Sequence, residues 1–419
     1  MLLAADRDLL ARDRSLPGLA VLLDPLNLAN QIEAAITTPS FELEGAYLRY
    51  KPGTNCLAGY RVRVGEQHTW LYAKAYAEPT GKLRRALIDP GMRGLLGFGR
   101  LVLPAWQIEV ACLPNDWRII GAQALFDPDQ QAAVLGKLLP GLVGPFSLTL
   151  LVYKPERRMV VRVDQVGQAG APVAVIKLYT VDGFRAARRA AQSFRATERL
   201  RLPRLLGMLE SGAMLAFAWE VGQPLPNALQ QGQAAADRVI AALSDLHAQG
   251  QADLPQLPAG QPIAAIEATL AAFGQLQPAY APQLATLAEQ FRTMLPTTHN
   301  FCPTHGDFYA KQVLLGNTAA VVLDLDEAAY GDPRDDLANL IAHLERDRLR
   351  GVLSETQLVQ AGMAYTEAYR RHGGSISGLQ VLVAARLLRL VLDPFRHREP
   401  NWPQRSQALL QRVQQLLQQ

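Results

Sequence analysis

The side chains best suited to chemistry lie in one segment of the last third of the chain. Asp307 ends a His-Gly-Asp triplet, Gln312 comes five residues later, and Asp324 follows the apolar run Ala320–Leu323. Phosphoryl transfer from ATP needs a carboxylate that orients an acceptor hydroxyl, and Asp307 can supply it. It also needs oxygen ligands for Mg²⁺, and an amide oxygen of Gln312 and a carboxylate of Asp324 are suitable ones.

A short β-like island among helical sequence must position these side chains. Val313–Leu315 and Val321–Leu323 are apolar, and Gly316-Asn317 lies in the connection between them. This pattern predicts a hairpin. The hairpin would bring Gln312 and Asp324 side by side.

An internal repeat organises the first half of the chain. Leu48–Pro52 recurs as Leu151–Pro155, and a lysine follows the lysine of each copy after 23 residues, at Lys74 and Lys177. The offset is 103 residues at both places. A third match relates residues 100–104 to residues 199–203, with an offset of 99. Three matches in the same order predict a duplicated unit of roughly 75 residues.

Each unit has the pattern strand, strand, strand, helix, strand. In the second unit we expect strands at 148–153, 159–163, 173–179 and 214–219, and a helix at 182–200 with Asp182 as its N-cap. Residues 221–226 break the pattern as a linker would, and the rest is mostly helical. The later helical stretches are expected at 234–248, 264–295 and 353–417.

Composition argues against nucleic-acid binding, cysteine-based metal or redox sites, and membrane insertion. The formal charge of the 419 residues is only +4, and basic and acidic residues are interspersed, so no nucleic-acid partner is expected. The three cysteines have no metal-site or redox spacing. The chain shows no signal-peptide pattern, and no apolar stretch reaches the roughly 18 residues of a membrane helix. We expect a soluble cytoplasmic protein without a membrane partner.

The full motif resembles the signature of the aminoglycoside phosphotransferase and choline kinase families, which share the protein-kinase fold. The resemblance rests on the His-Gly-Asp triplet with its later amide, on Asp324, and on the tail Gly331–Ala338, and it covers residues 147–400 approximately. It implies that Asp307 is the catalytic base, that Gln312 and Asp324 hold Mg²⁺, and that Asp336 caps the following helix.

The resemblance also implies an ATP-binding lobe in the second repeat. Lys177 would bind phosphate, and the segment Trp219–Gly222 resembles a hinge in which Glu220 and Val221 would contact adenine. The expected fold class is α+β, a two-lobed protein-kinase-like fold with a duplicated small lobe in front. The expected domains are a cap at 1–145, an ATP lobe and hinge at 146–223, and a helical catalytic and substrate lobe at 224–419.

Two departures from the family pattern bear on function. The family usually has Asn at the position of Gln312, but maltokinase-like proteins are similar to this chain in using Gln there and in having an extra N-terminal cap. This favours a sugar acceptor. The helix after Lys177 lacks the usual Glu near Gln192 and Ser193, and Glu198 is the nearest. The alternative function is therefore a nucleotide-binding pseudokinase with a regulatory or scaffolding role.

The roles of several further residues are compatible with more than one interpretation. Residues 1–145 could be a structural cap or a homodimer interface, or Lys74 could mark a second ligand site. Asp326 could be a further metal ligand or a structural aspartate, and His247 and His343 are expected to be packed or surface residues. The later helices are rich in arginine, which disfavours a polycationic acceptor and favours a sugar or another neutral small-molecule hydroxyl compound; these arginines are Arg350, Arg386, Arg389, Arg396 and Arg398.

Overall fold

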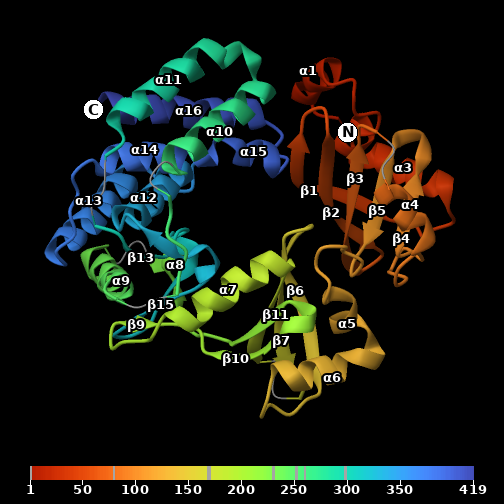
Figure 1. The fold of residues 1–419 in the computed structure, drawn as a ribbon, viewed down its shortest axis with the longest axis horizontal. Coiled ribbons are helices and arrows are strands. Elements are labelled where there is room, and N and C mark those ends of the chain that lie inside the picture. Colours follow the sequence, from red (N-terminus) through yellow and green to blue (C-terminus); the bar gives the residue numbers. More distant parts are fainter. Residues whose placement is uncertain are drawn as a thin grey trace. The chain divides into compact units, whose positions relative to one another are not determined.

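The computed structural model describes residues 2–78, 81–167, 171–228, 232–250, 253–258, 261–296 and 300–419. The chain forms two compact units. The first comprises Met1–Phe184, Leu206–Phe217 and Pro394–Pro403, and the second comprises Arg185–Leu205, Ala218–Asp393 and Gln404–Gln419. Helices and sheets occur together, as the predicted α+β class requires (Figure 1). The predicted division into three domains remains a prediction.

The first unit begins with a five-stranded antiparallel sheet. Its strand order is β1-β2-β3-β5-β4, with β1 at Glu42–Lys51, β2 at Asn55–Val64, β3 at Gln67–Tyr76, β5 at Ile108–Cys112 and β4 at Arg100–Leu103. The accompanying helices are α1 (Ala4–Arg12), α2 (Leu19–Leu23), α3 (Pro25–Ala35), α4 (Gly81–Ile88), α5 (Ala122–Phe126) and α6 (Pro128–Leu138).

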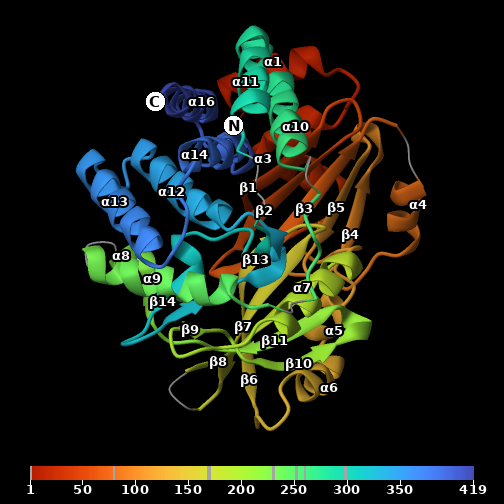
Figure 2. The ribbon, with the colours of Figure 1, turned by 60° about the vertical axis from the view of Figure 1, so that its left-hand side comes forward.

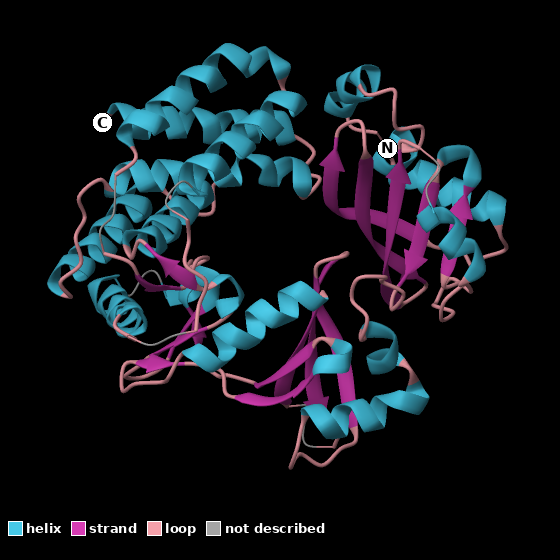
Figure 3. Ribbon diagram, in the orientation of Figure 1, coloured by secondary structure: helices cyan, strands magenta, loops and turns pink. Residues whose placement is uncertain are grey.

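A second five-stranded sheet in the same unit repeats this topology (Figure 3). Its order is β6-β7-β8-β11-β10, with β6 at Phe146–Lys154, β7 at Arg158–Gln165, β8 at Pro172–Tyr179, β11 at Met214–Ala218 and β10 at Leu205–Leu209. A left-handed residue also precedes the fourth-placed strand in both sheets, Gln107 with φ 51° and Ala213 with φ 52°. The shared order is what a duplicated unit predicts.

The two sheets share one hydrophobic core. Met159, Val161 and Val163 alternate along β7 and are each fully buried. They belong to the same cluster as Leu57 and Tyr72 of the first sheet. Because side chains alternate between the faces of a strand, one face of each sheet supplies this core. The first sheet is therefore packed as part of this unit.

The helix after β8 differs from its prediction at both ends. Helix α7 spans Val181–Ser193, and the Thr180 hydroxyl, not Asp182, accepts a hydrogen bond from the Gly183 N–H over 3.2 Å. The predicted helix ran to Leu200, but the Ser193 hydroxyl donates to the Arg189 carbonyl over 2.8 Å, a local bond that competes with helix continuation. Strand β10 was not predicted at all.

The second unit is mainly helical (Figure 2). Helix α12 packs against both α13 and α14. The predicted stretch 264–295 is broken at Pro278, because proline cannot continue the backbone hydrogen bonds of a helix. The helices that follow α7 in the chain are α8 (Leu225–Ala228), α9 (Gly232–His247), α10 (Gln261–Leu276), α11 (Ala281–Met294), α12 (Arg334–Leu349), α13 (Glu355–Arg371), α14 (Leu379–Arg389), α15 (Asp393–Arg396) and α16 (Trp402–Gln418).

The predicted hairpin is present in this unit. Strand β14 (Val313–Leu315) pairs antiparallel with β15 (Ala320–Val322), and Val313 lies opposite Val322. Strand β9 (Leu200–Arg201) extends the sheet beside β15, and β12 (Gln223–Pro224), within the predicted linker, pairs with β14. A second pair, β13 (Cys302–Thr304) with β16 (Ala329–Gly331), leads directly into the His-Gly-Asp triplet.

Candidate active site

His305 fixes the backbone of the His-Gly-Asp turn. Its side chain is fully buried, Nε2 donates to the Leu323 carbonyl over 2.8 Å, and Nδ1 accepts from the Asp307 N–H over 3.2 Å. A carbonyl can only accept and an N–H can only donate, so both bonds require the tautomer protonated on Nε2. His305 therefore ties the Asp307 backbone to the end of the β14–β15 hairpin.

Gly306 is required by the shape of the same turn. Its φ is +81°, in the left-handed region that side chains disfavour. A Cβ atom added there would lie 2.2 Å from the Glu327 carbonyl oxygen. No larger residue can occupy this position without displacing the turn.

Asp336 holds the turn and does not cap the helix that contains it, contrary to the prediction. Its carboxylate accepts from the N–H groups of His305 and Gly306, over 2.8 and 2.9 Å, and lies 2.9 Å from Nε2 of His247. Asp332 instead accepts from the N–H of Arg334, the first residue of α12. Asp336 lies in the first turn of α12, but both of its carboxylate oxygens accept from the His305 and Gly306 N–H groups, so it serves the neighbouring loop.

The charge state of Asp336 follows from these contacts. Burial alone would raise its pKa, but the hydrogen bond and positive charge of His247 and the bond from the His305 N–H together lower the pKa. His247, expected as a packed or surface residue, is thus a partner of the active-site turn. No local pattern in the sequence marks this pairing, because the two residues lie 89 positions apart.

Asp307 presents its carboxylate beside Asn339 of α12. The Asn339 side-chain N–H₂ donates to Oδ1 of Asp307 over 3.3 Å and to the Phe308 carbonyl over 3.0 Å. Burial, the main cause, raises the pKa of Asp307, and the charge of Asp324 raises it further against the hydrogen bond from Asn339, which lowers it. A raised pKa makes Asp307 a better proton acceptor than an ordinary aspartate.

Gln312 and Asp324 lie side by side, as the hairpin predicted. The Gln312 Nε2 donates to Oδ2 of Asp324 over 3.2 Å. The described residues contain no cluster of three or more His, Cys, Asp or Glu that would hold a metal by itself. One carboxylate with one amide fits Mg²⁺ bound together with substrate phosphates, which needs few protein ligands. Rotation of the amide would turn its oxygen towards the metal.

Arg386 of α14 contacts the candidate active site, although the sequence indicated it only as one of several basic residues. Its Nη1 donates to the Gly306 carbonyl over 3.2 Å, and its Nη2 pairs with Asp335 over 3.3 Å. The first bond lies next to Asp307, and the second lies at the start of α12. Arg386 therefore ties α14 to the turn that carries the candidate base.

The predicted hinge at Trp219–Gly222 remains a prediction, and its residues have the following surroundings. Glu220 pairs with Arg201 over 2.8 Å, and Val221 is 78% exposed. A Cβ atom on Gly222 would lie 2.9 Å from the Leu314 side chain, so the backbone passes close to β14 there. Val221, Gly222 and Leu315 help to line a hollow of about 550 Å³.

Lys177 and Lys74 hold equivalent positions in the two sheets but differ in environment. Lys177 on β8 is half-buried, and its Nζ lies 5.8 Å from the centre of the Phe217 ring. Lys74 on β3 is only 6% exposed, and its Nζ lies 2.7 Å from Oε1 of Glu156. Lys177 belongs to the first unit, whereas the other candidate site residues belong to the second.

Glu156 lies in the turn between β6 and β7, where a kinase phosphate loop would be. Besides Lys74, Arg49 binds its carboxylate over 2.5 Å, and its own N–H donates to Asp116 over 2.7 Å. Burial opposes ionisation, but Lys74 and Arg49 lower the pKa of Glu156. Lys74 is thus neutralised by a buried acid, which favours a structural role for the first sheet.

Comparison with known proteins decides the family. A family model described as the phosphotransferase enzyme family matches residues 148–374, more than half of the chain. The chain belongs to this family. The predicted resemblance to aminoglycoside phosphotransferases and choline kinases, with their kinase-like fold, is thereby confirmed. The chain is a small-molecule kinase, whereas its maltokinase-like features remain a prediction.

Several solved structures are similar to this phosphotransferase. A choline/ethanolamine kinase family protein from Mesorhizobium loti is 17% identical, with a TM-score of 0.49 and coverage of 70% of this chain and 95% of that one. A thermostable mutant of aminoglycoside phosphotransferase APH(4)-Ia with ADP and hygromycin B is 17% identical, with a TM-score of 0.46 and coverage of 68% and 97%. A putative fructosamine-3-kinase from Thermobifida fusca is 20% identical, with a TM-score of 0.45 and coverage of 67% and 98%.

One further comparison and a search for membrane-spanning helices were both negative. The comparison with curated proteins found no match. Within the described part of the chain, no helix is both long and apolar enough to cross a bilayer.

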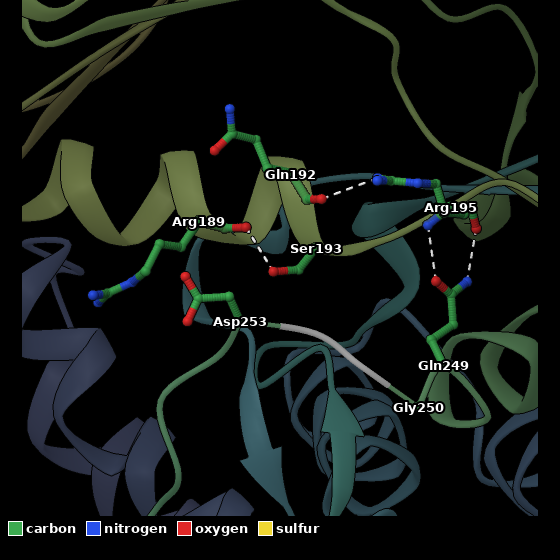
Figure 4. Close-up of a pocket in the computed structure, with 7 residues that line it drawn as sticks. All are labelled: Arg189, Gln192, Ser193, Arg195, Gln249, Gly250 and Asp253. Atoms are coloured by element: carbon green, nitrogen blue, oxygen red, sulfur yellow. Dashed lines mark hydrogen bonds between the residues drawn. The ribbon is translucent and has the colours of Figure 1, made fainter.

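The glutamate that the family usually has in the helix after the strand lysine is missing from the whole of helix α7. Its sequence contains no Glu, and Glu198 lies beyond its end. The C-terminal half of α7 instead borders a polar hollow of about 390 Å³ (Figure 4). There the Gln249 amide bonds the backbone of Arg195 twice, accepting from its N–H over 2.8 Å and donating to its carbonyl over 2.7 Å.

Proposed function

We propose that this phosphotransferase moves the γ-phosphate of ATP to a hydroxyl of a sugar-like small molecule in a Mg²⁺-dependent reaction. The observation that carries the proposal is the pairing of Gln312 with Asp324, 3.2 Å apart, in the same unit as the half-buried carboxylate of Asp307. This set supplies a base and a metal site, which are the parts that phosphoryl transfer requires.

Each candidate residue has a defined task in this proposal. Asp307 orients the acceptor hydroxyl and accepts its proton, and its raised pKa suits that role. Gln312 and Asp324 would hold Mg²⁺, which supplies charge neutralisation for the transferring phosphoryl group. Lys177 binds ATP phosphate, and the backbone at Glu220 and Val221 contacts adenine.

The electrostatics of α12 support a sugar-like acceptor over a polycationic one. A polyamine acceptor would need free carboxylates, but the acids of this helix are engaged by arginines of the protein. Asp335 pairs with Arg386, and Glu345 pairs with Arg412 over 2.6 Å. The site therefore offers few carboxylates to a cationic ligand.

The test is ATP- and Mg²⁺-dependent release of ADP with a panel of sugars, amino alcohols and aminoglycosides. We expect stimulation by a sugar-class acceptor and loss of at least about a hundredfold in kcat for Asp307→Asn, because base catalysis is removed. The exposed Asp8→Asn serves as a matched control and should keep full activity. Lys177→Met should raise the KM for ATP, and Lys137→Met, on an exposed face of α6, should not.

The absence of Glu from α7 favours one second candidate, a nucleotide-binding pseudokinase. A pseudokinase would bind ATP and release no ADP with any acceptor. Turnover separates the two functions, whereas ATP binding does not. Homodimerisation through residues 1–145 and a cytoplasmic location remain predictions, and light scattering of the purified protein tests the first.

A further inference from the structure

The position of Arg389 in α14 is set by Arg386, one turn earlier. Arg386 bonds the Gly306 carbonyl and Asp335, so this face of α14 is held against the turn that carries Asp307. Residues three apart on a helix lie on the same face. Arg389 is therefore held near Asp307, and its positive charge lowers the pKa of that carboxyl against the dominant effect of burial.

Arg389 has no fixed partner in the described part of the chain. Its side chain is exposed to solvent, and it forms neither a hydrogen bond nor an ion pair there. Desolvation by the surrounding protein and then the charge of Arg386 lower the pKa of Arg389, whereas the charges of Asp307 and Glu327 raise it. A guanidinium held beside a base without a bonding partner can bind a ligand through its planar fork of N–H groups.

Several cations act on His343, on the neighbouring part of α12. His343 stacks on Tyr309, with ring centres 4.1 Å apart, two residues after Asp307. Burial lowers the pKa of His343, and so do the charges of four cations, namely Arg346, Lys311, Arg350 and Arg386. Its Nδ1 is buried and has no hydrogen-bond partner among the described residues.

Lys311 is the second cation of this group that is open to a ligand. It lies in the segment between Asp307 and Gln312, is exposed, and forms no hydrogen bond or ion pair within the described residues. The acids on α12 do not offset this charge, because Asp335, Glu345 and Asp347 are each paired with an arginine. The acids of α12 are therefore not free to neutralise Arg389 and Lys311, whereas Asp307 and Glu327 lie close enough to Arg389 to raise its pKa.

We propose that Arg389, with help from Lys311, binds an anionic group of the acceptor, a carboxylate or a phosphate ester. The acceptor is then a hydroxy acid, a sugar acid or a sugar phosphate. This inference rests on the proposed function, since Asp307 defines where the acceptor hydroxyl lies. Guanidinium bonds to carboxylate and phosphate oxygens are often bidentate, so Arg389 would orient the acceptor as well as attract it.

Matched pairs of acceptors test the charge preference directly. ADP release is compared for glycerol and D-glycerate, and for glucose, glucuronate and glucose 1-phosphate. We expect the anionic members to have kcat/KM values about tenfold to hundredfold higher, the range of a charge-assisted hydrogen bond. Glucuronate and glucose 1-phosphate distinguish a carboxylate ligand from a phosphate ligand. Equal values for charged and neutral members would overturn the proposal.

Substitutions then assign the preference to Arg389. Arg389→Met should raise the KM for the anionic acceptor about tenfold or more and remove the preference over its neutral partner. Arg389→Lys should restore part of the preference, and Lys311→Met should weaken it. Arg370→Met, at an exposed arginine of α13, should leave the preference intact. An equal fall in kcat for charged and neutral acceptors would mean that Arg389 acts on the transferred phosphate, which overturns the proposal.

A binding measurement separates failure of this inference from failure of the proposed kinase activity. Inorganic phosphate and D-glycerate are titrated against the wild-type protein and Arg389→Met by calorimetry, without ATP. Binding that is lost in Arg389→Met supports the anion site even if no acceptor is turned over. Binding that is absent in the wild type, or that survives in Arg389→Met, overturns the inference even if the chain proves to be an active kinase.

Discussion

Gln312 donates a hydrogen bond through Nε2 to Oδ2 of Asp324 over 3.2 Å, although twelve positions separate them in the chain. The pairing of Val313 with Val322 across the β14–β15 hairpin brings the two side chains together. Asp324 itself has a left-handed backbone with φ 61°, which ends the strand and turns the chain into the next segment. The two proposed metal ligands are thus built from one short local element.

Removal of the Gln312 amide should weaken Mg²⁺ binding. We expect Gln312→Ala to raise the Mg²⁺ concentration for half-maximal activity at least about tenfold, because a metal ligand is lost. Gln312→Asn keeps the amide but is one methylene shorter, so a smaller increase is expected. Titration of activity with Mg²⁺ measures both. Gln130→Ala, which removes an exposed glutamine bonded to Asp127 outside the site, should not change the Mg²⁺ requirement.

The raised pKa of Asp307 predicts an acid limb in the pH profile. Only the ionised carboxylate can accept a proton, so kcat/KM should fall as pH drops through the pKa of Asp307, and this limb should lie above the ordinary aspartate range. Asn339→Leu should move the limb to higher pH, because it removes a hydrogen bond that lowers the pKa. A limb that stays in place in Asn339→Leu would contradict the assignment of Asp307 as the base.

The lowered pKa of Asp336 predicts a pH-dependent contribution to stability. A depressed carboxyl pKa contributes stability above the unfolded-state pKa of about 4, and this contribution is lost as pH falls through the folded-state pKa. Asp336→Asn should cost about 3 kcal/mol of unfolding free energy at pH 7 and less under acid conditions. Urea unfolding from pH 7 to pH 3 measures the difference. A cost that does not depend on pH would show that the charge of Asp336 is not what matters.

The buried Lys74–Glu156 pair should be strongly coupled. Glu156→Gln leaves a buried ammonium without its counter-ion and should cost about 3–5 kcal/mol of unfolding free energy. The double variant Lys74→Met with Glu156→Gln should lose less than the sum of the two single losses. Glu44→Gln, in the exposed pair with Arg61 on the same sheet, should cost under about 1 kcal/mol. Additive losses at Lys74 and Glu156 would contradict a direct pairing.

The parts of the site that sequence reasoning predicted are those encoded locally. Asp307, Gln312 and Asp324 share one short segment. The apolar runs at 313–315 and 321–323 predicted their hairpin, and the observed strands are 313–315 and 320–322. Four of the five strands of the second sheet, all except β10, were predicted near their observed ends because runs rich in β-forming residues between turn signals mark strands.

The contacts that were missed all join distant parts of the chain. Arg386 reaches the Gly306 carbonyl across 80 positions, and His247 reaches Asp336 across 89. Neither residue stands in a pattern that a local spacing rule detects. The end of α7 was missed for another reason, since it depends on the Ser193 side chain and on bonds from Gln249, not on helix propensity.

The burial of Lys74 against Glu156 limits how the chain can be divided. A shortened chain starting at residue 146 would strip the β6–β7 turn of Lys74, Arg49 and Asp116, and would expose the apolar face that now meets Leu57 and Tyr72. The first sheet, conversely, would keep an ammonium in its interior with no acid to receive it. The two sheets of this unit therefore depend on each other for folding. Neither should form a stable, independently folding domain when the other is removed.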